Sequence, residues 1–154
     1  MEREITHVVI HCTATKEGVP FGRDAIDRSH RARGFREIGY HYVVNADGSV
    51  EVGRPEHKQG AHVKGHNKFT IGIVYVGGLD SSGKPKDTRT LAQITSLKIL
   101  VMYLQLKYPK ADIVGHRDLS PDKDGDGKVE KHEWLKACPC FDVHSFVQNE
   151  CCIQ

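Results

Sequence analysis

Two histidines and a cysteine at distant positions of this chain could together hold a transition metal. The chain carries ten histidines in 154 residues, and this abundance favours metal binding or proton transfer. His11 and His116 each end a predicted strand, while Cys138 lies in the turn 136–139, KACP. Zinc binds imidazole nitrogen and thiolate sulfur tetrahedrally, and catalytic sites keep one position for water. Spacing alone does not define the site, because these residues lie far apart in the sequence. Taken singly, any one of the histidines is more simply explained as an ordinary surface or core residue.

The cysteines are five in number, at positions 12, 138, 140, 151 and 152. An odd count does not fit the paired framework of small secreted domains. In a reducing compartment, a thiol that lies close to histidines is a candidate metal ligand or nucleophile. No function follows from the sequence for the Cys151-Cys152 tail.

A second metal site is predicted from residues 122–133, DKDGDGKVEKHE, which match a calcium-loop pattern at every specified position. The oxygen ligands would be Asp122, Asp124, Asp126, the Lys128 carbonyl and Glu133. Gly127 would allow the sharp turn, and Glu130 could act through water. Ser120-Pro121 stands where an entering helix is expected, and only the exit stretch 131–136, KHEWLK, reads as helical. The alternative is a solvated acidic loop that merely resembles the motif.

Strands and helices alternate along the chain in a way that would position these groups. Short β-branched runs predict strands at 5–11, 70–76 and 112–116, and two alternating runs around 46–48 predict a hairpin. The run 70–76 is apolar on both faces and is expected to be central. Helices are predicted at 23–33, ended by Gly34, and at 88–108, ended by Pro109. The order predicts one α/β domain over 1–154, with a mixed central sheet flanked by helices and an insertion at 120–133.

Composition limits the possible partners. Lys and Arg number 22 against 20 Asp and Glu, so the net charge is only +2, which does not favour nucleic-acid binding. No apolar run is long enough to cross a bilayer, and the N-terminus lacks the apolar stretch of a secretory signal. We therefore expect synthesis in the cytoplasm, no membrane insertion and a monomer.

Five blocks of sequence resemble one enzyme family in the family's own order. They are ITHVVIHCTAT (5–15), GYHYVV (39–44), GAHVKGHNKFTIGIVYVGG (60–78), VGHRDLSP (114–121) and KACPCFDV (136–143). Together they are similar to the zinc-dependent N-acetylmuramoyl-L-alanine amidases of the phage T7 lysozyme type, whose fold peptidoglycan recognition proteins share. The resemblance covers about residues 3–147, and several ordered blocks are far more specific than any one of them.

The resemblance implies roles for individual residues. It makes His11, His116 and Cys138 the zinc ligands, and the Lys-x-Cys-Pro match selects Cys138 over Cys140. Tyr40 and Lys136 match the family's two other catalytic positions. The implied substrate contacts are His41, His62, His66 and Asn67. T7-type enzymes have a shorter connection where this chain carries 120–133, so this segment is an insertion relative to them. A calcium ion bound there would support the structure and take no part in catalysis.

The implied activity is hydrolysis of the amide between N-acetylmuramic acid and L-alanine in peptidoglycan. Zinc would activate water, Lys136 would stabilise the oxyanion, and Tyr40 would orient the water or pass a proton to the leaving amine. The expected role is a phage or prophage lysis enzyme acting on the bacterial cell wall. The main alternative is a non-catalytic peptidoglycan-binding module, although such modules have lost the cysteine ligand. A protein kinase and a paired calcium sensor are excluded, since HRDL at 116–119 lacks the other kinase motifs and only one loop is present.

Overall fold

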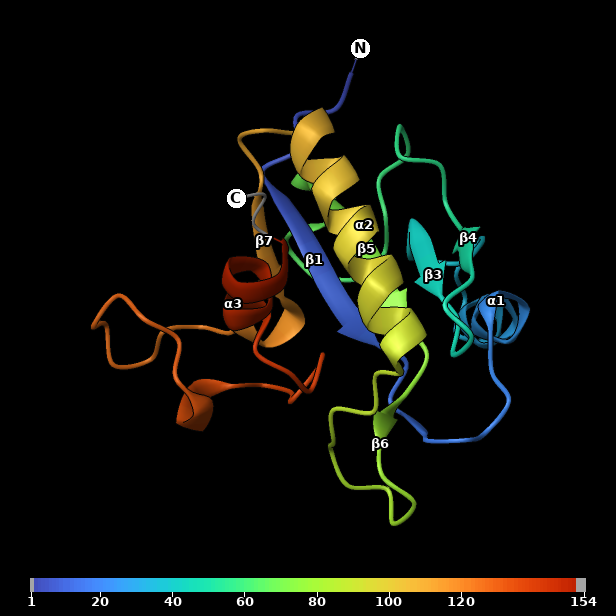
Figure 1. The fold of residues 1–154 in the computed structure, drawn as a ribbon. Coiled ribbons are helices and arrows are strands. Elements are labelled where there is room, and N and C mark those ends of the chain that lie inside the picture. The colour runs from blue at the N-terminus through green and yellow to red at the C-terminus, as the bar shows by residue number, and fades with distance from the viewer. Residues whose placement is uncertain (1, 152–154) are drawn as a thin grey trace.

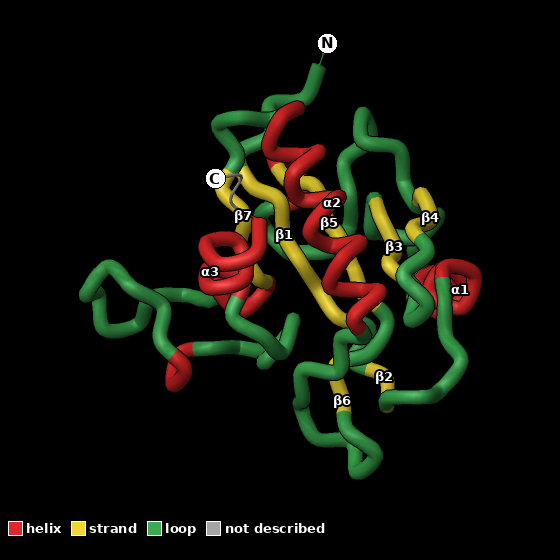
Figure 2. Tube along the Cα trace, viewed as in Figure 1, coloured by secondary structure: helices red, strands yellow, loops and turns green. Residues whose placement is uncertain are grey.

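A five-stranded mixed sheet forms the centre of the molecule in a computed structural model, which describes residues 2–151. The strand order is β4-β3-β5-β1-β7. Their bounds are β1 His7–Cys12, β3 Tyr42–Val44, β4 Val50–Val52, β5 Thr70–Tyr75 and β7 Asp112–Gly115. Only β4 runs antiparallel to its neighbour, and the other pairings are parallel (Figure 1). A short parallel pair, β2 (Thr15–Lys16) and β6 (Gly78–Leu79), follows the main sheet (Figure 2).

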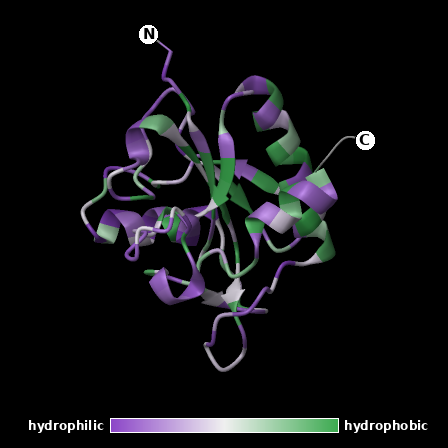
Figure 3. Ribbon diagram, turned by 90° about the vertical axis from the view of Figure 1, so that its left-hand side faces the viewer, coloured by the Kyte–Doolittle hydropathy of each residue, from purple (hydrophilic) through white to green (hydrophobic). Residues whose placement is uncertain are grey.

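Helices cover both faces of this sheet. Helix α2 (Leu91–Lys107) and the short α3 (Val143–Phe146) pack on one face, over Val8, Ile10 and the alternate residues of β5. Helix α1 (Arg23–Ala32) contributes Ile26 to a smaller cluster on the opposite face, with Val43 and Val74. Apolar residues accordingly gather along the central strands in the side view (Figure 3). The remaining turns are 3-10 helical at Asn67–Phe69, His116–Leu119 and Lys131–Glu133, and π-helical at Val147–Cys151.

Most of the predicted elements are confirmed. The central position of β5 agrees with its six buried residues, and the hairpin β3–β4 turns at Gly48, whose φ of 85° favours glycine. Helix α2 begins later than predicted because Thr90 is its N-cap. The Thr90 hydroxyl accepts from the Gln93 N–H at 3.1 Å, and the Gln93 side chain accepts from the Thr90 N–H at 2.9 Å.

The prediction of a helix over 131–136 is wrong. Only the single turn Lys131–Glu133 forms, and the chain then continues without regular structure to Cys138. The Glu133 side chain is fully buried and accepts hydrogen bonds from the backbone N–H groups of Lys123, Asp124 and Glu130. These bonds fold the segment back on the preceding loop, and too few residues remain before Pro139 to continue a stable helix.

The described part of the chain ends at a buried cysteine. Cys151 is buried against the main core, while Cys152 and the limits of the predicted domain 1–154 lie outside the described residues. Among the helices that the structure describes, none has the length and apolar character needed to cross a membrane.

Two buried histidines hold the fold together as neutral rings. His30 Nδ1 accepts a hydrogen bond from the Gly39 N–H at 2.8 Å, and His41 Nδ1 accepts one from the Gly72 N–H at 2.9 Å. Burial, reinforced by nearby arginines, lowers the pKa of His30 to about 4. Burial also lowers the pKa of His41 to about 4. Both rings therefore act as acceptors for backbone groups and do not carry charge near neutral pH.

Acidification should destabilise the metal-free protein through His30. The unfolded ring takes up a proton near pH 6.5, whereas the pKa of the folded ring is about 4. The unfolded state thus binds more protons between these values, and stability falls as the pH drops through that window. His30→Asn keeps an acceptor for Gly39 without a titrating ring. It should remove up to about 2 kcal/mol of this pH dependence, with allowance for solvent screening.

Urea unfolding from pH 7 to pH 4 measures this dependence. His144→Asn, at an exposed histidine, is the control and should keep the wild-type slope of stability against pH. Equal slopes for His30→Asn and wild type would contradict the assignment of this proton uptake to His30.

Candidate metal centre and substrate groove

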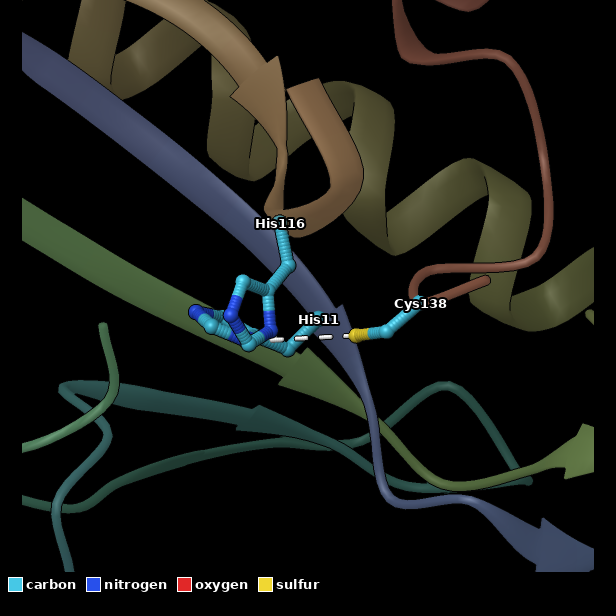
Figure 4. Close-up of side chains that lie close together, drawn as sticks. All are labelled: His11, His116 and Cys138. Carbon is cyan, nitrogen blue, oxygen red and sulfur yellow. Dashed lines mark hydrogen bonds between the residues drawn. The ribbon is translucent and has the colours of Figure 1, made fainter. Parts of the chain in front are cut away.

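Three side chains that could hold a metal ion converge at the carboxyl-terminal edge of the sheet. Strands β1 and β7 pair in parallel with Ile10 opposite Gly115, so His11 and His116 follow side by side. Their ring centroids lie 4.6 Å apart. Cys138 arrives from the loop before α3, with its Sγ 3.9 Å from His11 Nδ1 (Figure 4). All three donor atoms lie within 4.8 Å of one another, which is close to the spacing of ligands around one small ion.

The protonation states of these side chains suit metal binding. Burial, and then the neighbouring rings of His62 and His116, hold the pKa of His11 well below its usual range. Burial and the charge of Lys136 also lower the pKa of His116. Hydrogen bonds from the Cys12 thiol and backbone N–H lower the pKa of Cys138, against the opposing effect of burial. Two neutral imidazoles and a readily formed thiolate are a donor set that fits zinc.

Cys138 and Pro139 are held by hydrogen bonds from β1, from β5 and from the turn that follows β7. The Cys12 N–H donates to Cys138 Sγ at 3.3 Å, and the Arg117 N–H donates to the Cys138 carbonyl at 2.8 Å. The Tyr75 hydroxyl donates to the Pro139 carbonyl at 2.6 Å. Cys140 points elsewhere, with its sulfur 3.9 Å from Cys12 Sγ, and is absent from the donor cluster. Of the two cysteines that compete in the sequence, the structure brings Cys138 to the histidines.

Tyr40 and Lys136 both line an open groove of about 690 Å³ that contains the cluster. The Tyr40 ring lies 5.1 Å from the His11 ring. Burial, and then the nearby thiols, raise the pKa of Tyr40, so its phenol stays protonated and can donate a hydrogen bond. Lys136 is exposed at the rim. A lysine and a phenol donor thus line the same groove as the cluster, and their catalytic roles stay predictions.

The four expected substrate contacts do not behave alike. His62 and Asn67 line the groove, but the Asn67 amide oxygen is already occupied by the backbone N–H groups of His62 and Val63. His41 is fully buried, forms a hydrogen bond through Nε2 with the Lys58 carbonyl, and does not line the groove. His66 is exposed and also lies outside the lining. Burial argues against a substrate contact by His41, and substrate contact by His66 stays a prediction.

The groove includes residues that sequence reasoning missed. Arg33, at the end of α1, and Lys64 add positive charge to it, and Phe35 adds an aromatic surface. Lys64 lies within the block 60–78 that resembles the family, so its position was a usable signal, whereas Arg33 and Phe35 lie outside all five blocks.

The predicted calcium loop projects from the body of the molecule as a long connection (Figures 1 and 2). Asp122, Asp124 and Glu133 offer carboxylate oxygens within 4.8 Å of one another, and the Asp126 carboxylate is not part of that cluster. Backbone N–H groups of Gly125 and Gly127 occupy both oxygens of Asp122. Calcium binding stays a prediction.

Comparison with known proteins identifies the family. The family model described as N-acetylmuramoyl-L-alanine amidase matches residues 1–133, a span that ends before Cys138. The endolysin of Escherichia phage T7 is 37% identical over 143 residues, covering 92% of this chain and 85% of the endolysin.

More distant relatives extend the likeness. A peptidoglycan-recognition protein of Drosophila melanogaster is 32% identical over 91 residues, covering 59% of this chain and 49% of its own length. The solved structure of the endolysin amidase LysCS from Clostridium intestinale superposes with a TM-score of 0.71 at 28% identity, covering 95% of this chain and 83% of that chain. With its fold, its cluster of two histidines and a cysteine, and these matches, the chain belongs to the N-acetylmuramoyl-L-alanine amidase family.

Proposed function

We propose that this protein is a zinc-dependent hydrolase of the phage endolysin type that cleaves the amide between N-acetylmuramic acid and L-alanine in peptidoglycan. The observation that carries the proposal is the convergence of His11, His116 and Cys138 in a groove that also holds Tyr40 and Lys136. Family membership supports the reaction. The relatives that are named endolysins support a role in lysis at the cell wall.

Zinc is the ion that best fits two imidazoles and one thiolate, and the donor set leaves it a formal charge of about +1. When bound, zinc supplies Lewis acidity, which activates water and polarises the scissile carbonyl. The groove is open and the cluster lies on its wall, so the amide of a glycopeptide can approach the ligands.

Two side chains of the groove can stabilise the charge that develops on the substrate during the reaction. The Lys136 ammonium at the rim offers a positive charge to the oxyanion that forms as the amide carbon becomes tetrahedral. The Tyr40 phenol, kept protonated by its raised pKa, can donate a hydrogen bond to the same oxygen or to the leaving nitrogen. Both roles require the side chains to face the cluster, and both residues line the same groove.

A non-catalytic peptidoglycan-binding module is the second candidate. It is favoured by the similarity to a peptidoglycan-recognition protein. The cysteine donor and the flanking Tyr40 and Lys136 favour catalysis instead, because a module that only binds has no use for an ion with an open coordination position.

Analysis of the products distinguishes the two candidates. Zinc-loaded protein should solubilise purified peptidoglycan and release L-alanine amino termini without new reducing sugar ends. Tyr40→Phe and Lys136→Met should each slow the release by about 10²-fold or more, because each removes one donor or charge at the oxyanion. Saturable binding of peptidoglycan without turnover would favour the binding module, and reducing ends without free amines would indicate a glycosidase.

Replacement of Cys138 tests the third ligand. Cys138→Ser should lose stoichiometric zinc, since a hydroxyl is a poor substitute for a thiolate, and should lower activity by about 10³-fold or more. Cys140→Ser, two residues away and outside the donor cluster, is the matched control and should keep a full zinc equivalent. Elemental analysis after dialysis measures both variants; a full zinc equivalent in Cys138→Ser would remove this residue from the ligand set.

We further predict that calcium, if bound at 122–133, orders the segment that leads to Lys136 and Cys138. Calcium added to chelator-treated, zinc-restored protein should then raise the melting temperature, and Asp122→Asn with Asp124→Asn should abolish the rise. The reason is that a ligand bound only by the folded state stabilises it by mass action. An unchanged melting temperature and unchanged activity would reduce the loop to a solvated acidic connection.

A further inference from the structure

Both ring nitrogens of His62 are engaged by protein groups beneath the metal cluster. His62 Nδ1 lies 2.9 Å from His11 Nε2, and His62 Nε2 lies 3.1 Å from the Thr70 hydroxyl. Thr70 is buried, with only 1% of its surface exposed. His62 therefore has no free nitrogen to offer to a substrate, although the residue lines the groove.

Two glycines pack so closely against the ring of His62 that a side chain at either position would clash with it. A Cβ atom added at Gly72, in β5, would lie 2.6 Å from His62 Cγ. One added at Gly60 would lie 2.6 Å from His62 Cδ2. The His62 and His11 rings meet edge to face, at 87° with centroids 5.0 Å apart. This close fit fixes the direction in which His62 presents Nδ1 to His11.

When His11 binds a metal through Nδ1, the nitrogen that faces Cys138, these hydrogen bonds are satisfied by only one placement of the ring protons of His11 and His62. A neutral imidazole that coordinates through Nδ1 carries its proton on Nε2. His11 Nε2–H then donates to His62 Nδ1, which must be unprotonated. His62 consequently carries its own proton on Nε2 and donates it to the Thr70 hydroxyl oxygen.

We propose that His62, supported by Thr70, is a positioning residue that fixes the ring orientation and tautomer of His11 for metal binding. The inference rests on the proposed metal site and adds to it the two residues, His62 and Thr70, that support the ligand His11. It also replaces the expectation that His62 contacts substrate. Metal-bound histidines generally donate their second N–H to a carboxylate, carbonyl or water; here the acceptor is a second imidazole.

A neighbouring histidine provides a matched control. The ring of His41 lies 5.8 Å from that of His62 and is fully buried in the fold. Its nitrogens, however, meet the Gly72 N–H and the Lys58 carbonyl, and neither of them meets a member of the metal cluster. Loss of His41 should therefore affect stability without a direct effect on metal affinity.

The experiment compares zinc affinity, by chelator competition, in the full-length protein and its variants. His62→Leu should weaken zinc binding by about 10- to 100-fold, the range found for groups that support a metal ligand. His62→Asn places an amide oxygen near the position of Nδ1 and should restore part of the affinity. Thr70→Val should weaken binding in the wild-type background and have no further effect in His62→Leu, because Thr70 acts through His62. His41→Gln should leave zinc affinity unchanged.

A second readout separates positioning from substrate contact. The visible absorption of the cobalt-substituted protein should change in His62→Leu and Thr70→Val, since it reports ligand geometry without substrate. Unchanged zinc affinity and cobalt spectrum, with a raised KM for a soluble muropeptide, would overturn the proposal and make His62 a substrate contact. If His62→Leu does not fold, His62→Asn and Thr70→Val still decide the question. Wild-type protein that binds no zinc would contradict the proposed function itself.

Discussion

The register of β1 between its two parallel neighbours is the constraint on which the site depends. His11 lies opposite Val74 of β5, and the preceding residue Ile10 lies opposite Gly115 of β7, directly before His116. Successive side chains of a strand point to opposite faces, so a slip of one residue would exchange His11 with an apolar neighbour. The approach of His11 to His116 is therefore specified by the same pairing that builds the core.

The two faces of β1 have different roles, since one packs into the core and the other carries His11. Val8, Ile10 and Cys12 pack into the core beneath α2 and α3, where their burial fixes the register by the hydrophobic effect. His11 lies on the other face, which α1 covers only in part, and this leaves the groove open above the cluster. Cys12 connects the two faces, because its side chain belongs to the core while its N–H donates to Cys138 Sγ.

The pattern of neighbouring residues was sufficient to predict the strands of the main sheet, the hairpin and the long helix. Short β-branched runs and three-four apolar spacing involve only residues that are close in sequence. The choice of His11, His116 and Cys138 needed the family resemblance as well, since these residues are far apart in the chain. The sequence near a loop residue does not reveal where its side chain points either. The ring of His41, for example, turns inward and accepts a hydrogen bond from the Gly72 N–H. The failed helix at 131–136 has the same origin, because its periodicity is helical but the buried Glu133 carboxylate binds three backbone N–H groups of the folded-back loop.

The abundance of histidine has a different meaning in the structure than in the sequence. Two of the ten lie in the metal cluster, whereas His30, His41 and His62 are rings that engage a backbone N–H or another imidazole within the fold. A neutral imidazole combines an acceptor and a donor on one rigid plane, so it can join two groups that must keep a fixed distance. Burial lowers the pKa of each of these three rings and keeps it neutral. Burial lowers the pKa of His11 in the same way, so acidification acts against the proposed ligand and against these three rings together.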